Sequence, residues 1–100
     1  MRLAIAQVEK VLNRTNVSHL QLDWSYPTGA EIWTSPAVAN GVIYIGSDNR
    51  KLYAFDASCR RDCQPLWFYA TDGGIWSSPA VANGLVYVGS DDGKLYAFGL

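Results

Sequence analysis

Two cysteines, Cys59 and Cys63, have the most distinctive spacing for chemistry in this 100-residue chain. They lie four positions apart in a polar stretch, and the chain has no third cysteine. An even number of cysteines in a loop favours a local disulfide, whereas two free thiols would indicate a reducing compartment. A metal site would need two further ligands, and the chain has a single histidine. The sequence therefore predicts a disulfide that staples this loop, and no metal site.

The other candidates for acid–base chemistry are one histidine and a set of repeated carboxylates. His19 has Asp23 as its nearest acidic residue in the sequence. A catalytic imidazole needs a nucleophile or a carboxylate held beside it, so we expect His19 at the surface. Asp48 and Asp91 recur at equivalent positions, which favours a role in turn geometry because a catalytic residue is normally unique. We therefore predict no catalytic residue, and the sequence identifies no cofactor-binding residue.

The feature that organises these residues is an internal repeat of 43 positions. Residues 24–57 and 67–100 share 21 identities in 34 aligned positions. A period of about 40–50 residues is typical of propeller blades. The repeated residues for which we expect structural roles are Trp24 and Trp67, Trp33 and Trp76, Gly41 and Gly84, and Asp48 and Asp91.

Each copy is predicted to form short antiparallel strands joined by tight turns. Asn40-Gly41 and Asn83-Gly84 lie between apolar runs, a pattern typical of type I′ hairpins. The run 42–45 is apolar on both faces, as expected for a covered sheet. The predicted fold class is all-β: two four-stranded antiparallel propeller blades, that is, a partial β-propeller, with a short N-terminal lead-in segment. The expected divisions are 1–22 for the lead-in, 23–66 for blade 1 and 67–100 for blade 2.

The tryptophans have two expected places in such a fold. Trp24 and Trp67 are predicted to dock between neighbouring blades, because a large ring buries much area there. Trp33 and Trp76 precede the Ser-Pro strands and are expected near one rim. For this second pair, packing in the core or at the rim is favoured over lining of a ligand surface.

Charge and hydropathy exclude two classes of partner. The net charge is −1 and the eight Lys and Arg residues are scattered, so the basic surface needed to bind nucleic acid is missing. Every apolar run is interrupted well before the ~20 residues of a membrane span. Residues 1–12 include Gln7, Glu9 and Lys10, so no signal peptide is predicted in this chain.

The repeated motifs resemble the bacterial pyrroloquinoline-quinone-like (PQQ-like) β-propeller repeat. The matching motifs are Ser-Pro-Ala-Val-Ala-Asn-Gly at 35–41, Tyr-Ile-Gly-Ser-Asp at 44–48, Lys-Leu-Tyr-Ala-Phe-Asp-Ala at 51–57 and Trp67, with a second copy at 78–98. The resemblance covers about 80 residues and is specific to the repeat, not to one function. Residues 58–65 depart from the family pattern by lengthening the blade end. The second copy stops at Gly99-Leu100, so we expect a fragment of a larger propeller.

The resemblance implies two functions. The first, resembling BamB-type assembly proteins, is a non-catalytic module for protein interaction or scaffolding, with no cofactor and a periplasmic or extracellular location. The alternative is part of a quinoprotein dehydrogenase that oxidises alcohols or sugars with PQQ and calcium. That family's adjacent cysteines and calcium-binding cluster are not recognised here, so the sequence favours the non-enzymatic reading.

Two blades alone also leave strand edges and apolar faces uncovered. The expected partners are therefore other propeller blades, supplied by self-association or by a longer parent chain, and a protein partner. Four copies of this chain would supply eight blades.

Overall fold

The computed structural model describes residues 12–99 and shows an all-β fold, as predicted, apart from one turn of 3-10 helix. This turn, η1, spans Val17–His19. The seven strands are β1 (Ala37–Ala39), β2 (Val42–Gly46), β3 (Lys51–Asp56), β4 (Trp67–Ala70), β5 (Ala80–Ala82), β6 (Leu85–Gly89) and β7 (Leu95–Phe98). Residues 1–11 of the predicted lead-in lie outside the described residues, and with them Gln7, Glu9 and Lys10 of the signal-peptide prediction. Leu100 of the predicted blade 2 also lies outside them.

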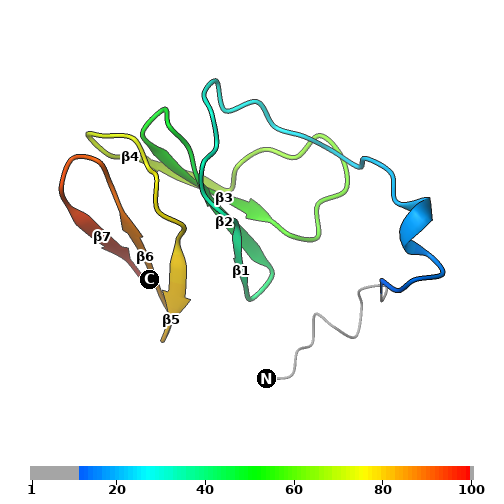
Figure 1. Ribbon diagram of the computed structural model, residues 1–100. Coiled ribbons are helices and arrows are strands. Elements are labelled where there is room, and N and C mark those ends of the chain that lie inside the picture. The colour runs from blue at the N-terminus through cyan, green and yellow to red at the C-terminus, as the bar shows by residue number, and fades with distance from the viewer. Residues whose placement is uncertain (1–11, 100) are drawn as a thin grey trace.

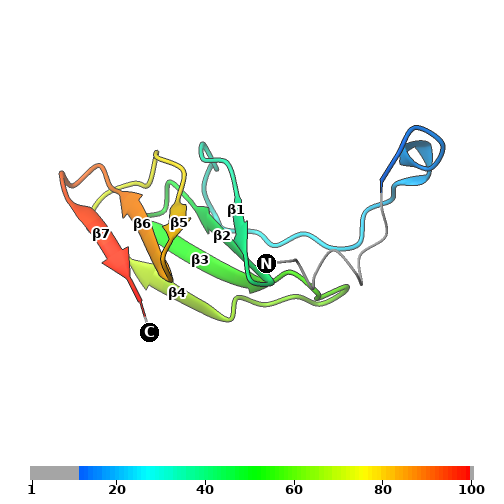
Figure 2. The ribbon, with the colours of Figure 1, turned by 90° about the horizontal axis from the view of Figure 1, so that it is seen from below.

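The strands form two antiparallel sheets that lie side by side (Figures 1 and 2). The first sheet has the order β1-β2-β3-β4, and the second has the order β5-β6-β7. The first strands of the two sheets, β1 and β5, are in contact. Two meandering sheets that repeat along the chain and pack on each other are consistent with two partial propeller blades.

The sheets do not follow the division by sequence repeat. Trp67–Ala70 opens the second copy of the repeat, yet this segment pairs with β3 as the fourth strand of the first sheet. The register pairs Ala54 with Trp67 and Lys51 with Ala70. Among the described residues the second sheet therefore has three strands rather than the four expected. The physical reason is that a strand joins the sheet whose edge it can reach by hydrogen bonds, whatever the phase of the repeat.

The two Asn-Gly hairpins have the predicted turn chemistry. Asn40 and Gly41 both have positive φ, 50° and 77°, and Asn83 and Gly84 repeat these values at 53° and 77°. A type I′ turn needs positive φ at both central residues, which Asn tolerates and Gly adopts freely. These turns join β1 to β2 and β5 to β6, and so fix the register of both hairpins.

The turn that precedes β3 contains an unfavourable residue. Arg50 has φ 77°, whereas the equivalent residue in the second copy is Gly93, with φ 85°. A residue with a side chain costs about 1–2 kcal/mol in the left-handed region. Glycine avoids this cost but loses more conformational entropy on folding, which cancels part of the gain. We therefore expect Arg50→Gly to stabilise the chain by about 1 kcal/mol and to raise its melting temperature by several degrees. Thermal unfolding followed by circular dichroism measures this change, and Gly93→Arg should lower the melting temperature.

The buried core lies between the two sheets. Its fully or nearly fully buried members are Leu52 of β3, Ile75 of the connection between sheets, and Val86 and Val88 of β6. Tyr44, Val81, Tyr96 and Phe98 pack against this cluster. Since both sheets contribute to it, the core holds the two partial blades together as one unit.

Candidate binding surfaces

A stacked pair of tryptophans is exposed where the two sheets meet. Trp33 and Trp76 precede β1 and β5, and their ring centroids lie 5.7 Å apart at an interplanar angle of 2°. The two residues are 56% and 55% exposed. The Ser35 backbone N–H donates to Ser78 Oγ at 2.8 Å just beside them, which links the same two segments. The result is a flat, exposed aromatic surface shared by the two sheets.

The residue that follows each tryptophan fixes its segment through side-chain hydrogen bonds to the backbone of a strand. Thr34 Oγ1 donates to the Gly46 carbonyl at 3.0 Å and accepts from the Gly46 N–H at 3.2 Å. Ser77 makes the same two bonds with Gly89, at 3.0 and 2.9 Å. Each hydroxyl thus bonds its segment to the end of β2 or β6, so the neighbouring tryptophans are supported by rigid strands. Thr34 and Ser77 were not among the predicted site residues, although their matching places in the repeat carried that signal.

The repeated aspartates lie in the turns that face these segments. The Asp48 N–H donates to the Glu31 carbonyl at 2.9 Å, and the Asp91 N–H donates to the Gly74 carbonyl at 2.8 Å. A methyl group built on Gly74 would lie 2.5 Å from Asp48 Oδ1 and 2.7 Å from Trp76 Nε1, so glycine permits this close approach. The turns and the tryptophan segments therefore form one hydrogen-bonded rim.

A tyrosine–aspartate pair marks the corresponding turn of the second sheet. Tyr96 Oη donates to Asp92 Oδ2 at 2.5 Å, and the backbone N–H of Asp72 donates to the same oxygen at 3.1 Å. The bond from Tyr96 lowers the pKa of Asp92, and the carboxylate in turn raises the pKa of Tyr96 from 10.0 to about 12. In the first sheet Asn49 takes the place of Asp92 and donates to Tyr53 Oη at 2.8 Å.

This pair gives a testable pH dependence. The raised pKa of Tyr96 contributes stability that is complete below pH 10 and is lost as the pH rises toward about 12. The lowered pKa of Asp92 contributes stability that is present above its ordinary value and is lost as the pH falls. In Asp92→Asn the pKa of Tyr96 should fall back toward 10, as measured by the ultraviolet absorbance of the phenolate, with Tyr96→Phe to identify the signal. An unchanged titration in Asp92→Asn would contradict this assignment.

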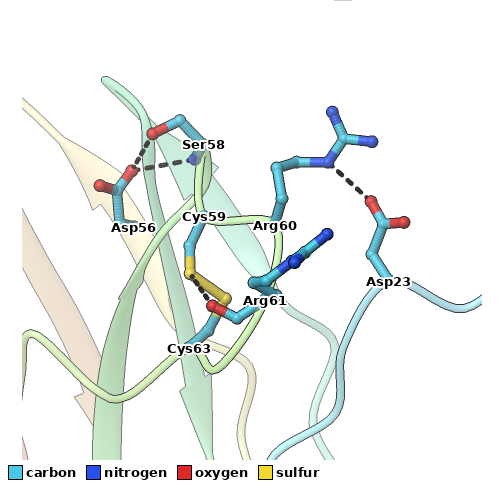
Figure 3. Close-up of a disulfide and its surroundings, with 7 residues drawn as sticks. All are labelled: Asp23, Asp56, Ser58, Cys59, Arg60, Arg61 and Cys63. Atoms are coloured by element: carbon cyan, nitrogen blue, oxygen red, sulfur yellow. Dashed lines mark hydrogen bonds and ion pairs between the residues drawn. A yellow bond between two sulfur atoms is a disulfide. The ribbon is translucent and has the colours of Figure 1, made fainter.

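The lengthened loop between β3 and β4 contains the disulfide (Figure 3). Cys59 and Cys63 are joined with an S–S distance of 2.03 Å, and Cys63 is buried. The Ser58 N–H and hydroxyl both donate to Asp56 Oδ1, which lowers the pKa of Asp56 and closes the start of the loop. Arg60 reaches across to Asp23, the first residue of the segment 23–27, here called the approach segment, with Nε 2.7 Å from Oδ2.

A cavity of about 530 Å³ lies between this loop and the approach segment. It is lined by residues 23–27 on one side and 61–64 on the other. The cavity belongs to the first sheet, because the loop that lines it has no equivalent in the second copy of the repeat. The insertion is visible in the sequence, but the cavity is not, because it depends on the spatial approach of Asp23 to the loop.

The remaining residues that the sequence singled out lie in ring contacts between aromatic side chains, in η1 or in the hairpin turns. Trp24 lies against Phe55 of β3, with ring centroids 5.3 Å apart, and Trp67 of β4 lies against Phe98 of β7, 5.1 Å apart. His19 is exposed in η1 and belongs to neither surface. Gly41 and Gly84 lie in the hairpin turns described above.

The described residues contain no metal-binding cluster and no membrane helix. Across 12–99, no three His, Cys, Asp or Glu side chains gather closely enough to hold a metal ion. In the same range no helix is long and apolar enough to cross a membrane.

The chain matches a known protein family. A family model described as "Outer membrane protein assembly factor BamB" covers residues 13–99. A search of curated proteins found no significant match. The matched range includes both sheets, the tryptophan pair and the disulfide loop. The chain therefore belongs to the PQQ-like repeat family described as outer membrane protein assembly factor BamB.

Proposed function

We propose that this propeller module is non-catalytic and binds a protein partner through the Trp33–Trp76 surface. The observation that carries the proposal is the parallel, exposed stack of the two rings. Tryptophan is enriched among the residues that contribute most to protein–protein affinity, because a large ring loses much water-exposed area on binding. A flat pair of rings suits a partner segment that presents apolar or aromatic side chains.

Preorganisation supports this role. The two rings stack on each other, and the residues that follow them are bonded to β2 and β6. Side chains already held in place lose less conformational entropy when a partner binds. The family description, an assembly factor for outer membrane proteins, also favours a protein as the partner over a small molecule.

We also propose that the protein acts in an oxidising compartment. The family description refers to the outer membrane, and the chain carries a disulfide between Cys59 and Cys63. Disulfides persist in the periplasm and outside cells, whereas reducing agents of the cytosol keep thiols free. A periplasmic or extracellular site of action is consistent with both facts.

The proposed partners also include other propeller blades. Large apolar side chains are exposed at both ends of the two-sheet unit, among them Ile32 and Leu95. Each sheet of a repeat architecture buries its apolar face against a neighbour. Further blades would cover these faces.

The test of protein binding uses a random peptide library displayed on phage, selected on the whole chain. We expect enriched peptides that bind the wild type and bind Trp33→Ala/Trp76→Ala at least about 30-fold more weakly, since even one such anchor contributes about 2 kcal/mol or more. Leu22→Ala is the matched control, because Leu22 is also apolar and exposed but lies outside the surface. Peptides that keep their affinity for the double variant would refute the assignment of this surface.

A parallel assay addresses the dehydrogenase alternative. The chain is given PQQ, calcium and a panel of alcohols and sugars together with a redox dye. We expect no dye reduction above that of PQQ and calcium alone. Turnover that depends on the chain would overturn the non-catalytic proposal.

A further inference from the structure

Residues 24–27 of the approach segment pack on the first sheet as β4 packs on the second. Trp24 and Tyr26 each lie 5.3 Å from Phe55, and Trp67 and Tyr69 each lie 5.1 Å from Phe98, measured between ring centroids. Each residue of the first cluster is 43 positions before its counterpart in the second. The segment 24–27 thus occupies the place of a fourth strand belonging to a preceding sheet. Within 12–99 it has no strand partner.

Within the part of the chain that the structure describes, the outer edge of β7 lacks the fourth strand that the first sheet has on β3. β7 corresponds to β3, which pairs along that edge with β4, but no described strand pairs there with β7. The effect on burial is large: Leu52 of β3 is 0% exposed, whereas its counterpart Leu95 of β7 is 73% exposed. The second sheet therefore presents an open edge and an uncovered leucine.

The isoleucines that precede the tryptophans give the same contrast at the opposite end. Ile75 is 0% exposed and fits closely against Gly46, where an added methyl group would overlap its side chain. Its counterpart Ile32 is 47% exposed. At Gly89, the counterpart of Gly46, an added methyl group would meet only the Ser77 side chain. One end of the two-sheet unit thus exposes Ile32. The other end exposes Gly89, which is equivalent to the Gly46 site that Ile75 fills between the two sheets.

We propose that a second copy of this chain fills the open end, so that its segment 24–27 becomes the fourth strand on β7. The register follows from the β3–β4 pairing moved by 43 positions: Lys94 opposite Pro27, Leu95 opposite Tyr26, Tyr96 opposite Ser25 and Ala97 opposite Trp24. Ile32 of the second copy packs against Gly89 and Leu95. The inference deepens the proposed association with other blades, and the interface continues the one already present between the two sheets.

Proline at position 27 is compatible with this pairing. In the first sheet Thr71 and Arg50 are opposite each other and bonded, since the Thr71 N–H donates to the Arg50 carbonyl at 2.7 Å. Bonded and non-bonded pairs alternate along an antiparallel ladder, so the N–H of Ala70 points away from β3. Pro27 is the counterpart of Ala70. Its missing N–H therefore removes no bond to β7.

The tryptophan stack and the hydrogen bond beside it extend across the same interface. Trp76 of one copy receives Trp33 of the next on its free face, and the Ser78 N–H donates to Ser35 Oγ of the next copy. The contact is head-to-tail, so repeated copies close into a ring where the rotation permits. Propellers have about four to eight blades, which corresponds to about two to four copies of a two-blade chain.

The test begins with the mass of the whole chain by light scattering. We expect one species of two to four chains, at most 44 kDa, four times the 11.0 kDa of one chain. Leu95→Glu and Ile32→Glu each place a charge in the interface and should each give an 11.0 kDa monomer with an unchanged circular dichroism spectrum. Leu20→Glu, which changes an exposed leucine outside the interface, should keep the wild-type mass.

Mixing the two disrupting variants distinguishes this interface from a symmetric one. Ile32→Glu retains an intact β7 edge and Leu95→Glu retains an intact approach segment. An equal mixture should therefore form a dimer, because one undamaged head-to-tail contact remains. A monomeric wild type, or a mixture that stays monomeric, would overturn the proposal. Peptide binding by monomeric Leu95→Glu, which keeps both tryptophans, tests the protein-binding function separately.

A cross-link provides a second measurement that does not depend on disrupting the fold. In Pro27→Cys/Lys94→Cys the two positions oppose each other across copies at a distance that a disulfide spans. Oxidation should give covalent oligomers on a non-reducing gel. Pro27→Cys/Leu95→Cys is the control, because successive side chains of a strand point to opposite faces. Equal cross-linking in both variants would refute the register.

Discussion

Ile75→Ala should destabilise the chain by about 2–5 kcal/mol, which is the range for truncating a fully buried isoleucine. Ile75 is completely buried between the sheets and belongs to the cluster formed with Leu52, Val86 and Val88. Removing its outer carbons leaves a cavity against Gly46, whose backbone is already fixed by two bonds to Thr34. Because that backbone cannot move in to fill the space, we expect the cost at the upper part of the range. Urea unfolding followed by tryptophan fluorescence measures the change.

The repeat provides a matched control for this prediction. Ile32 occupies the equivalent position, precedes a tryptophan in the same way and is largely exposed. Ile32→Ala should cost less than about 1 kcal/mol, in keeping with most surface substitutions. Both variants are compared on the Leu95→Glu background, where the proposed contact with a second copy is blocked. Equal losses in the two variants would show that Ile75 does not anchor the interface between sheets.

The second large effect is expected from the disulfide. Cys59→Ser/Cys63→Ser should lower the free energy of unfolding by about 2 kcal/mol, the value that chain entropy gives for a loop of about five residues. The loss follows mainly from the greater freedom of the unfolded chain. Adding a reducing agent to the wild type should reproduce most of the change, and adding it to the double variant should have no effect.

A comparison separates the disulfide from the ion pair that lies beside it. Arg60 and Asp23 form their pair with both side chains substantially exposed to water. Exposed pairs of this kind contribute less than about 1 kcal/mol. Arg60→Ala should therefore change the unfolding midpoint much less than loss of the disulfide. A larger effect of Arg60→Ala would mean that the contact with the approach segment, not the covalent bond, stabilises the loop.

The local features of the fold were predictable because two or three adjacent residues determine them. Asn40-Gly41 and Asn83-Gly84 fix their own turns, so sequence alone is sufficient to place both hairpins. The apolar runs on either side of these turns likewise indicated strands and the all-β class. The 43-residue spacing added the repetition of sheets.

Other features depend on neighbours that the local sequence does not specify. Ile32 and Ile75 have the same residue type and the same following tryptophan, yet one is exposed and the other is buried. Their difference arises from which sheet lies next to them. The strand Trp67–Ala70 likewise opens a sequence repeat but closes a sheet, because it pairs with the edge of β3, the strand before it in the chain.

The candidate sites show the same division. The cysteine spacing was visible in the sequence, and the structure joins Cys59 to Cys63. The exposure of Trp33 and Trp76 was left open, since a repeated tryptophan suits a buried interface as well as a rim. Their parallel stacking required two segments 43 residues apart to meet, which only the packing of β1 beside β5 brings about.

The offset between repeat and sheet has an evolutionary consequence. Consider a gene that grows by duplication of a 43-residue unit. The opening strand of each new unit, the counterpart of Trp67–Ala70, pairs with the sheet formed by the unit before it. Successive duplicates are thus interlocked from the moment they arise, without any linker having to evolve. Recombination that breaks the coding sequence between 66 and 67 would strip a strand from an existing sheet, whereas a break between 70 and 71 would leave that sheet whole.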